Sequence, residues 1–244
     1  MIKCDLHTHT LKSRCGYCSP LEMMNQAADL GLDALAITDH GTYTGGYISH
    51  ALFRLPDMYR GVRVLKGVEV TICEDAQKIG LPAKYLHNFD LVISGFHNAL
   101  PESDNPKKNN EYLIRYLDAH PYIDIISHPG SNGFPLDMSS VIPELIPRGV
   151  AFELNNAKLA QGKADLEQLR VMVEMVVTHQ GRLVLNSDAH TVFEVGQDDA
   201  IRAFLDTLTP VPESCIVNRN LESVVAFIEE RKPAKFVHKC NKGI

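Results

Sequence analysis

Six histidines, one glutamate and one aspartate stand where short apolar runs of this sequence end. These eight residues are His7, His9, His40, Glu69, His97, His128, Asp188 and His190. Imidazole nitrogens and carboxylate oxygens are donors that zinc and related divalent cations take in catalytic sites. One such histidine alone is more often an ordinary structural residue, but the repetition at successive strand ends indicates a shared metal site.

The spacing within the groups supports the same interpretation. Strand alternation places His7 and His9 on one side of the chain, so both imidazoles can face one ion. Asp188 and His190 repeat this two-residue spacing, and Glu69 ends an apolar run where a buried carboxylate needs a cation. Eight or nine donors exceed the needs of one ion, so we expect two or three metals, some sharing a carboxylate.

Short β-branched runs that alternate with helical patterns predict the elements that position these donors. The expected strands are 3–6, 35–38, 62–70, 89–94, 123–127, 150–154 and 182–186. The expected helices are 20–30, 109–119, 163–180 and 221–231. Such alternation favours a mostly parallel α/β sheet, and at this length a closed barrel. Because the carboxyl ends of parallel strands share one face, the donors would converge there, bordered by the aperiodic stretches 71–88 and 98–108.

Composition narrows the class of protein. The 244 residues are 45% hydrophobic and 22% charged, with a formal net charge of -6, which fits one globular domain. Runs of like charge are absent from the sequence, so nucleic acid is an unlikely partner and a membrane is not expected. No apolar run approaches the roughly 18 residues of a membrane span. Six cysteines spread thinly along the chain indicate reduced thiols, and we expect a soluble, cytoplasmic protein.

Seven motifs together resemble those of the PHP family, the polymerase and histidinol phosphatase domains. They are DLHTH (5–9), AITDHG (36–41), GVE (67–69), SGFH (94–97), ISHPG (126–130), FELNN (152–156) and NSDAH (186–190). Their order and spacing resemble most the YcdX-type trinuclear zinc phosphatases of that family. The resemblance covers nearly the whole chain. It implies a single PHP domain over residues 1–244, with an α/β fold that is a distorted (β/α)7 barrel, and a symmetric homo-oligomer, a trimer.

By motif position, the resemblance implies three ligand sets in the cleft at the carboxyl ends of the strands. The first metal takes His7, His9, Glu69 and Asp188; the second takes Glu69, His97 and His128; the third takes His40, His190 and one residue from the loop after the first strand. That last ligand is a histidine in the family, whereas the matching position here is Cys15.

Cys15 departs from the family pattern in a way that allows three interpretations. A thiolate is a good zinc ligand, so Cys15 can replace the imidazole and favour zinc over manganese. Alternatively, Cys15 is a loop thiol beside a weak third site, or it forms a redox pair with Cys18. Ligation is the preferred interpretation because the local spacing matches.

The function that this resemblance implies is metal-dependent hydrolysis of small phosphomonoesters. A hydroxide bridging two metals would attack, with His7, His9, Glu69, His97, His128 and Asp188 acting through it. Three zinc ions are expected, with manganese or iron as alternatives. Two other functions stay open: a phosphodiesterase or exonuclease acting on short nucleic acids, and a non-catalytic metal-binding module. The lack of tryptophan and of a basic stripe argues against the first, and retention of the donors argues against the second.

Several further residues have weaker assignments. Asp5 and Asp39 are candidates to orient His7 and His40, or each simply ends its strand. Arg14 and Lys158 are candidates to recognise phosphate, although a solvated surface charge is the preferred interpretation of each. The other five histidines are expected to be ordinary surface residues. They are His50, His87, His120, His179 and His238.

Overall fold

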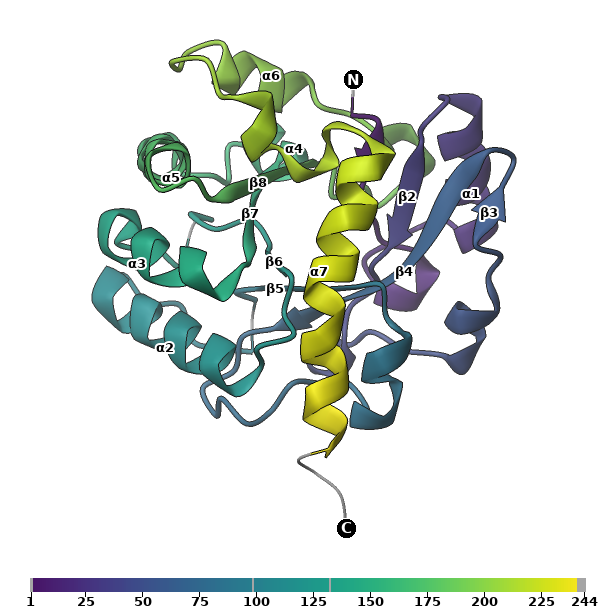
Figure 1. Cartoon of the computed structure of the whole chain (residues 1–244), viewed down its shortest axis with the longest axis horizontal. Helices are drawn as coiled ribbons and strands as arrows, with labels where there is room; N and C mark the ends of the chain where they lie inside the picture. The colour runs from purple at the N-terminus through teal and green to yellow at the C-terminus, as the bar shows by residue number, and fades with distance from the viewer. Residues whose placement is uncertain (1, 98, 132, 241–244) are drawn as a thin grey trace.

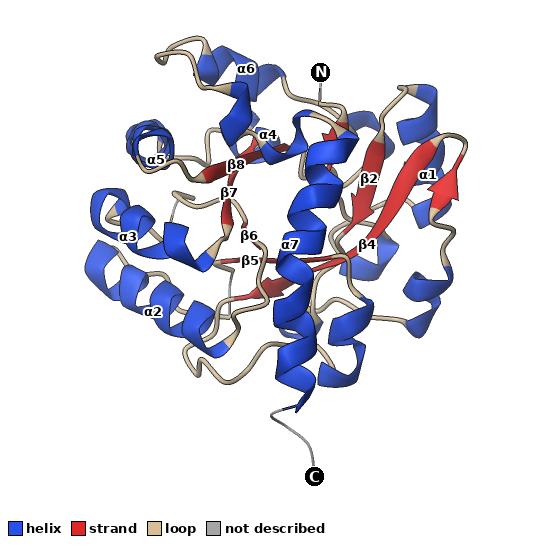
Figure 2. Ribbon diagram, in the orientation of Figure 1, coloured by secondary structure: helices blue, strands red, loops and turns tan. Residues whose placement is uncertain are grey.

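The computed structural model describes residues 2–97, 99–131 and 133–240, which form a parallel sheet wrapped by helices (Figures 1 and 2). The strands are β1 (Cys4–Asp5), β2 (Ala34–Ile37), β3 (Met58–Tyr59), β4 (Val62–Thr71), β5 (Leu91–Gly95), β6 (Ile125–Ile126), β7 (Ala151–Asn155) and β8 (Arg182–Asn186). Seven of them pair in parallel in the order β1-β2-β4-β5-β6-β7-β8, and β3 adds to β4 antiparallel.

The first and last strands of this order nearly close the sheet. Thr8 and Ala189 form an isolated parallel bridge, and the backbone N–H of Leu6 donates to the Asn186 side chain at 3.0 Å. The sheet is therefore an almost closed seven-stranded barrel, which confirms the expected distorted (β/α)7 architecture.

Helices surround the barrel, and local sequence explains where most of them begin. They are α1 (Pro20–Asp29), α2 (Pro106–Ala119), α3 (Met138–Leu145), α4 (Asn156–Ala160), α5 (Leu166–Thr178), α6 (Asp199–Leu205) and α7 (Leu221–Cys240). Ser19 and Glu22 form a reciprocal capping box at the start of α1, which begins at Pro20 as predicted. Asp165 caps α5, so that helix begins three residues later than expected.

Two hydrophobic layers hold the barrel together. Its interior is filled by small and branched side chains such as Ala36, Ile93 and Val184, and residues of α7, including Phe227, pack into the same cluster. A larger cluster lies between the outer face of the sheet and helices α2, α3 and α5. The helix α7, which lies across the barrel in Figure 1, thus plugs the amino-terminal end and leaves the carboxyl end for chemistry.

The main differences from the predicted elements are short or displaced segments. Helices α3, α4 and α6 and strand β3 were not predicted, and α7 extends to Cys240 instead of ending near residue 231. Strand β6 is only two residues long within the predicted 123–127.

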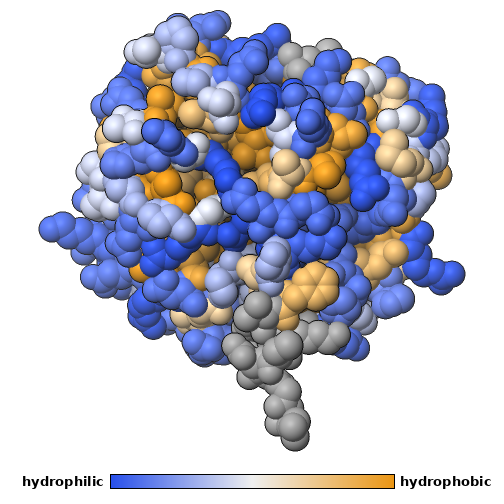
Figure 3. Space-filling model, in the orientation of Figure 1, coloured by the Kyte–Doolittle hydropathy of each residue, from blue (hydrophilic) through white to orange (hydrophobic). Residues whose placement is uncertain are grey.

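The face over α7 is mostly hydrophilic (Figure 3). Within the described ranges, no helix has both the length and the apolar character needed to cross a bilayer.

Candidate metal centre

Glu69 lies at the centre of the predicted donors. It sits near the end of β4, is 1% exposed, and its carboxylate oxygens lie within 3.4 Å of five imidazoles. The distances are 3.3 Å to His7 Nε2, 3.3 Å to His9 Nε2, 3.0 Å to His40 Nδ1, 3.4 Å to His97 Nε2 and 3.0 Å to His128 Nε2. The strand order thus brings together side chains that are up to 121 residues apart (128 − 7).

Asp188, which follows β8, is a second carboxylate that lies close to several imidazoles. Its Oδ1 lies 3.4 Å from His7 Nε2, 3.2 Å from His9 Nε2 and 3.8 Å from His190 Nδ1. Asp188 has a φ of 56° and His128 a φ of 34°, a left-handed conformation that is uncommon outside glycine. Such strain at two donor positions is typical of functional sites, where the surrounding structure enforces it.

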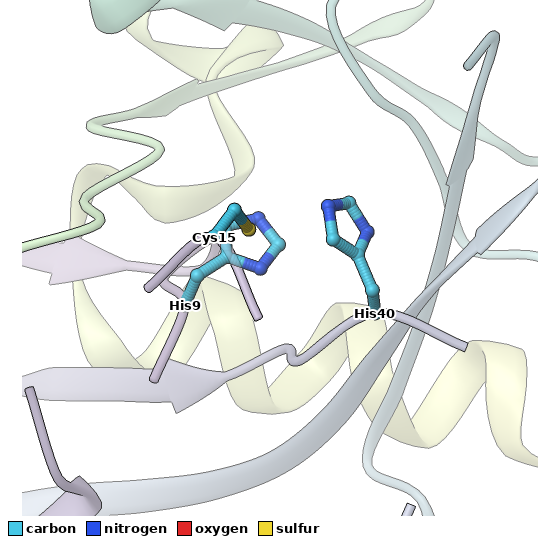
Figure 4. A group of neighbouring side chains, drawn as sticks. All are labelled: His9, Cys15 and His40. Carbon is cyan, nitrogen blue, oxygen red and sulfur yellow. The ribbon is translucent and has the colours of Figure 1, made fainter. Parts of the chain in front are cut away.

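Cys15 completes a third group at the edge of this cluster. One donor atom each from His9, Cys15 and His40 lie within 4.8 Å of one another, and Figure 4 shows the two imidazoles facing each other with the thiol beside His9. Burial would raise the pKa of Cys15, but interactions with His190 and His40 lower it to about 6. The thiol therefore ionises readily at neutral pH, as a zinc ligand must.

Several buried polar atoms of the cluster form no hydrogen bond of acceptable geometry with the described residues, although His40 Nδ1 and Glu69 Oε2 lie 3.0 Å apart. These atoms are His40 Nδ1, Glu69 Oε2, His97 Nδ1 and His128 Nδ1. The Nε2 atoms of His7 and His9 also face each other at 2.9 Å. Unpaired buried polar atoms are costly, so their number on the imidazoles around Glu69 fits a site that binds cations. Nitrogen, carboxylate and thiolate donors together fit zinc.

The protonation of the cluster without metal follows from its carboxylates. Burial alone would lower the pKa of His7, but Glu153, Asp188 and Glu69 raise it well above its ordinary value. His40 behaves in the same way, with a pKa raised to about 10, mainly by Glu69 against the effect of burial. The pKa of His97 is lowered to about 4 because burial outweighs the attraction of Glu69. Metal binding must therefore displace protons from some of these imidazoles.

Glu153 contacts the cluster although the sequence analysis did not single it out within the motif 152–156. It is fully buried on β7, and its Oε1 accepts from His7 Nδ1 at 2.8 Å and from Asn186 Nδ2 at 2.8 Å. Its Oε2 accepts from the backbone N–H of His128 at 2.7 Å. One carboxylate therefore fixes the Nδ1–H tautomer of His7, leaving Nε2 for a metal, and also holds the strained backbone of His128.

Asp39 orients a histidine, but not through a contact with the His40 ring. The Ser13 hydroxyl donates to Asp39 Oδ1 at 2.7 Å, so its lone pairs are free to accept from His9 Nδ1 at 2.9 Å and from the His40 backbone N–H at 2.9 Å. This chain fixes His9 with Nε2 facing the cluster. Ser13 could have been suspected only from its position in the loop after β1.

The prediction that Asp5 orients His7 is wrong. The Asp5 carboxylate accepts from the Ser187 hydroxyl and backbone N–H and from the Gly196 N–H at 2.9 Å. It thus ties the end of β1 to the loop after β8, where the barrel closes.

A cleft of about 870 Å³ opens beside the donor cluster. Cys15, His40, His97 and His128 line it, together with both predicted phosphate-binding candidates, Arg14 and Lys158. The expected border stretch 98–108 contributes Ala99 and Glu102, whereas none of the described lining residues comes from 71–88.

The remaining histidines lie away from the cluster. His50 and His179 are exposed and His87 is half-buried, in line with the expected surface role. His120 is 2% exposed, so the prediction that it is a surface residue is wrong; it pairs with the Tyr122 hydroxyl at 2.8 Å beneath α2. The side chain of His238 lies outside what the structure describes.

Comparison with known proteins places the chain in a family. The PHP domain model matches residues 5–157. A probable phosphatase of Acetivibrio thermocellus is 33% identical over 232 residues, covering 93% of this chain and 95% of that protein. One from Shewanella sediminis is 30% identical over 232 residues, covering 93% and 94%. The chain therefore belongs to the PHP domain family, as a hydrolase of the phosphatase type.

Solved structures share the fold at low sequence identity. The histidinol phosphate phosphatase of Lactococcus lactis, solved with zinc, L-histidinol and phosphate, superimposes with a TM-score of 0.55 at 13% identity, covering 86% of this chain and 95% of that one. The putative histidinol phosphatase of Listeria monocytogenes gives 0.51 at 15% identity, covering 80% and 98%. These similarities confirm the PHP barrel.

Proposed function

We propose that this protein hydrolyses small phosphomonoesters at a trinuclear zinc centre. The observation that carries the proposal is Glu69, a buried carboxylate within 3.4 Å of five imidazoles and without a lysine or arginine ion pair among the described residues. The probable phosphatases that match nearly the full chain support the activity. Zinc and phosphate in the Lactococcus enzyme of the same fold are consistent with it.

Three ligand sets account for the donors. His7, His9, Glu69 and Asp188 would hold the first ion; Glu69, His97 and His128 the second; Cys15, His40 and His190 the third. Close groupings of His7, His9 and Glu69, and of His40, Glu69 and His97, support the shared role of Glu69. Cys15 as a third-site ligand is supported by its place beside His9 and His40 and by its lowered pKa.

The chain's own residues would position both the metals and the substrate. Bound zinc supplies Lewis acidity and a reactive water at neutral pH. Glu153 and Ser13 keep the Nε2 atoms of His7 and His9 directed into the cluster. Lys158, on the cleft wall beside His128, is placed to offset charge on the phosphoryl oxygens. Because the nucleophile would be a water supplied by bound metal, no serine or cysteine nucleophile is needed in this scheme.

Turnover of p-nitrophenyl phosphate by protein stripped of metal and then reloaded tests the proposal. We expect activity to disappear on chelation and to return with zinc, saturating near three ions per chain. Turnover of a phosphodiester in place of the monoester would support the exonuclease-type alternative. Bound zinc with neither activity would instead indicate a binding module and refute the proposal.

A further inference from the structure

Arg14 is held at the rim of the cleft by an unusual local structure. It follows the short helix Leu11–Ser13 with a φ of 63°, directly before Cys15. Its side chain lies over Gly45, where an added Cβ would come within 3.0 Å of Arg14 Cδ and Nη1. Because Gly45 has no side chain, the Arg14 side chain can pack against its backbone. The left-handed backbone of Arg14 directs the guanidinium toward this turn.

Lys158 occupies a different and deeper position. It lies in α4 after β7 and lines both the cleft and a small recess beside His128, Glu153 and Asn155. Arg14 follows β1 and leans on the turn after β2, and strands β4, β5 and β6 separate β2 from β7 in the barrel order. The two cations therefore come from different parts of the cleft rim. Lys163 also lines the cleft, and no described residue forms an ion pair with any of the three.

Two buried aromatic rings border part of the cleft. Phe96 and Phe134 both line the cleft, with stacked rings whose centroids are 4.9 Å apart at an interplanar angle of 13°. A volume of about 870 Å³ also exceeds what a lone phosphate needs. The cleft can therefore take a carbon skeleton that joins a phosphoryl group to a second anionic group.

We propose that the preferred substrates carry a second anionic group, a carboxylate or another phosphate, which Arg14 binds while Lys158 faces the scissile phosphoryl group. The planar guanidinium can form a bidentate hydrogen bond with such an anion, whereas the lysine acts as a point charge. This inference rests on the proposed phosphatase function and names its substrate class. Glu102, the acidic residue at the same cleft, lies against Gly133 on the wall that carries Phe134, away from the Gly45 turn.

Binding of non-hydrolysable phosphonates to the zinc-loaded protein tests this assignment by calorimetry. The probes are ω-phosphonocarboxylates of three to six carbons, each paired with the alkylphosphonate of the same length. At least one phosphonocarboxylate should bind about 10-fold more tightly than its partner, since a hydrogen-bonded charge pair is worth that much. Arg14→Met should abolish the preference. Lys158→Met should weaken both members of a pair alike and keep the preference, and Arg115→Met, at an exposed position on α2, should change neither.

The outcomes separate this inference from the proposed function. Equal binding of every pair by the wild type, or an unchanged preference in Arg14→Met, overturns the role of Arg14, whatever the enzyme's turnover of p-nitrophenyl phosphate. Arg14→Lys guards against a folding artefact, because it keeps the charge and should retain part of the preference. Failure to hydrolyse p-nitrophenyl phosphate, together with an intact preference, would instead refute the phosphatase proposal.

Discussion

The two ends of the barrel each bury a carboxylate, and they satisfy it in opposite ways. At the amino end, Asp124 Oδ2 lies 2.8 Å from Lys235 Nζ and its Oδ1 lies 3.4 Å from Arg231 Nε, both on α7. At the carboxyl end, Glu69 contacts five imidazoles and, among the described residues, no lysine or arginine. Lysine and arginine stay protonated at neutral pH, whereas imidazoles can release protons and bind metal.

The groups around the two carboxylates also differ in how completely they are hydrogen-bonded. Around Asp124 both cations form further hydrogen bonds. Arg231 also donates to the carbonyls of Arg148, Pro121 and Ile123, and Lys235 donates to that of Asp90. Around Glu69 several buried nitrogens form no hydrogen bond with the described residues. Loss of one partner from a buried, hydrogen-bonded charge pair destabilises the fold, whereas a buried carboxylate among nitrogens without hydrogen bonds fits a ligand site.

Removing the central carboxylate should give the largest functional effect. Glu69→Gln keeps the shape but weakens two ligand sets, so we expect turnover to fall about 1000-fold or more, since metal-based charge stabilisation is worth several kcal/mol. Circular dichroism should still report a folded protein. Turnover within about 10-fold of wild type, measured after zinc loading, would contradict the role of Glu69 as a carboxylate that holds the metals.

The opposite result is expected at the other end of the barrel. Asp124→Ala leaves Arg231 and Lys235 buried without their counter-charge, which should lower the free energy of unfolding by about 3–5 kcal/mol. The turnover per folded molecule should change little, because the cluster lies at the far end. Urea unfolding measures the first quantity, and a loss of activity without a loss of stability would contradict the assignment.

Glu153 provides an intermediate case, a buried carboxylate that acts through a histidine. Glu153→Gln keeps an acceptor for His7 Nδ1 but removes the charge that raises its basicity, so zinc affinity should fall about 10- to 100-fold. Competition with a chelator of known affinity measures this. An unchanged affinity would indicate that Glu153 serves only the fold.

The pH dependence of the metal-free protein distinguishes titratable from fixed charges. Burial would lower the pKa of His40, but Glu69 and Cys15 raise it to about 10 from an ordinary value of 6.5. A raised folded-state pKa gives stabilisation that is full below pH 6.5 and lost as the pH rises through about 10. Because the pKa of Cys15 is lowered to about 6, its own contribution grows over part of this range, so the test uses the Cys15→Ser background, where the unfolding free energy should fall by about 1 kcal/mol or more between pH 7 and 10. His40→Asn should flatten this slope; an equal slope in both proteins would argue against the ion pair with Glu69.

The smallest expected effect concerns the third ligand set. Cys15→Ser should lower the bound zinc by about one ion per chain, because a hydroxyl is a poorer ligand than a thiolate. Cys18→Ser, three residues away and half-buried, is the matched control and should bind the full number. Plasma emission analysis of both variants decides the matter, and identical metal content would favour the loop-thiol interpretation of Cys15.

The sequence was sufficient for the barrel and for the convergence of donors because both follow from repeated local patterns. Apolar runs that end in His40, His97 or His128 predict strands and their functional ends without knowledge of the packing. Glu153 was missed for the opposite reason: it lies inside a strand, and only the side-by-side arrangement of β6, β7 and β8 shows what its oxygens contact.

Other misses have the same origin in tertiary contacts. Nothing local to Asp5 in the sequence shows that closure of the barrel supplies Ser187 and Gly196 as its partners. His120 has no local pattern that marks it as buried, and α2 covers it together with Tyr122. The strained φ of Arg14 is likewise set by the loop that follows β1.

Diffraction at the zinc edge from crystals of the zinc-loaded protein tests the central claim most directly. Three anomalous peaks are predicted, one beside His7, His9, Glu69 and Asp188, one beside Glu69, His97 and His128, and one beside Cys15, His40 and His190. The absence of any peak within bonding distance of Glu69 would contradict the claim that its ring of imidazoles is a metal site.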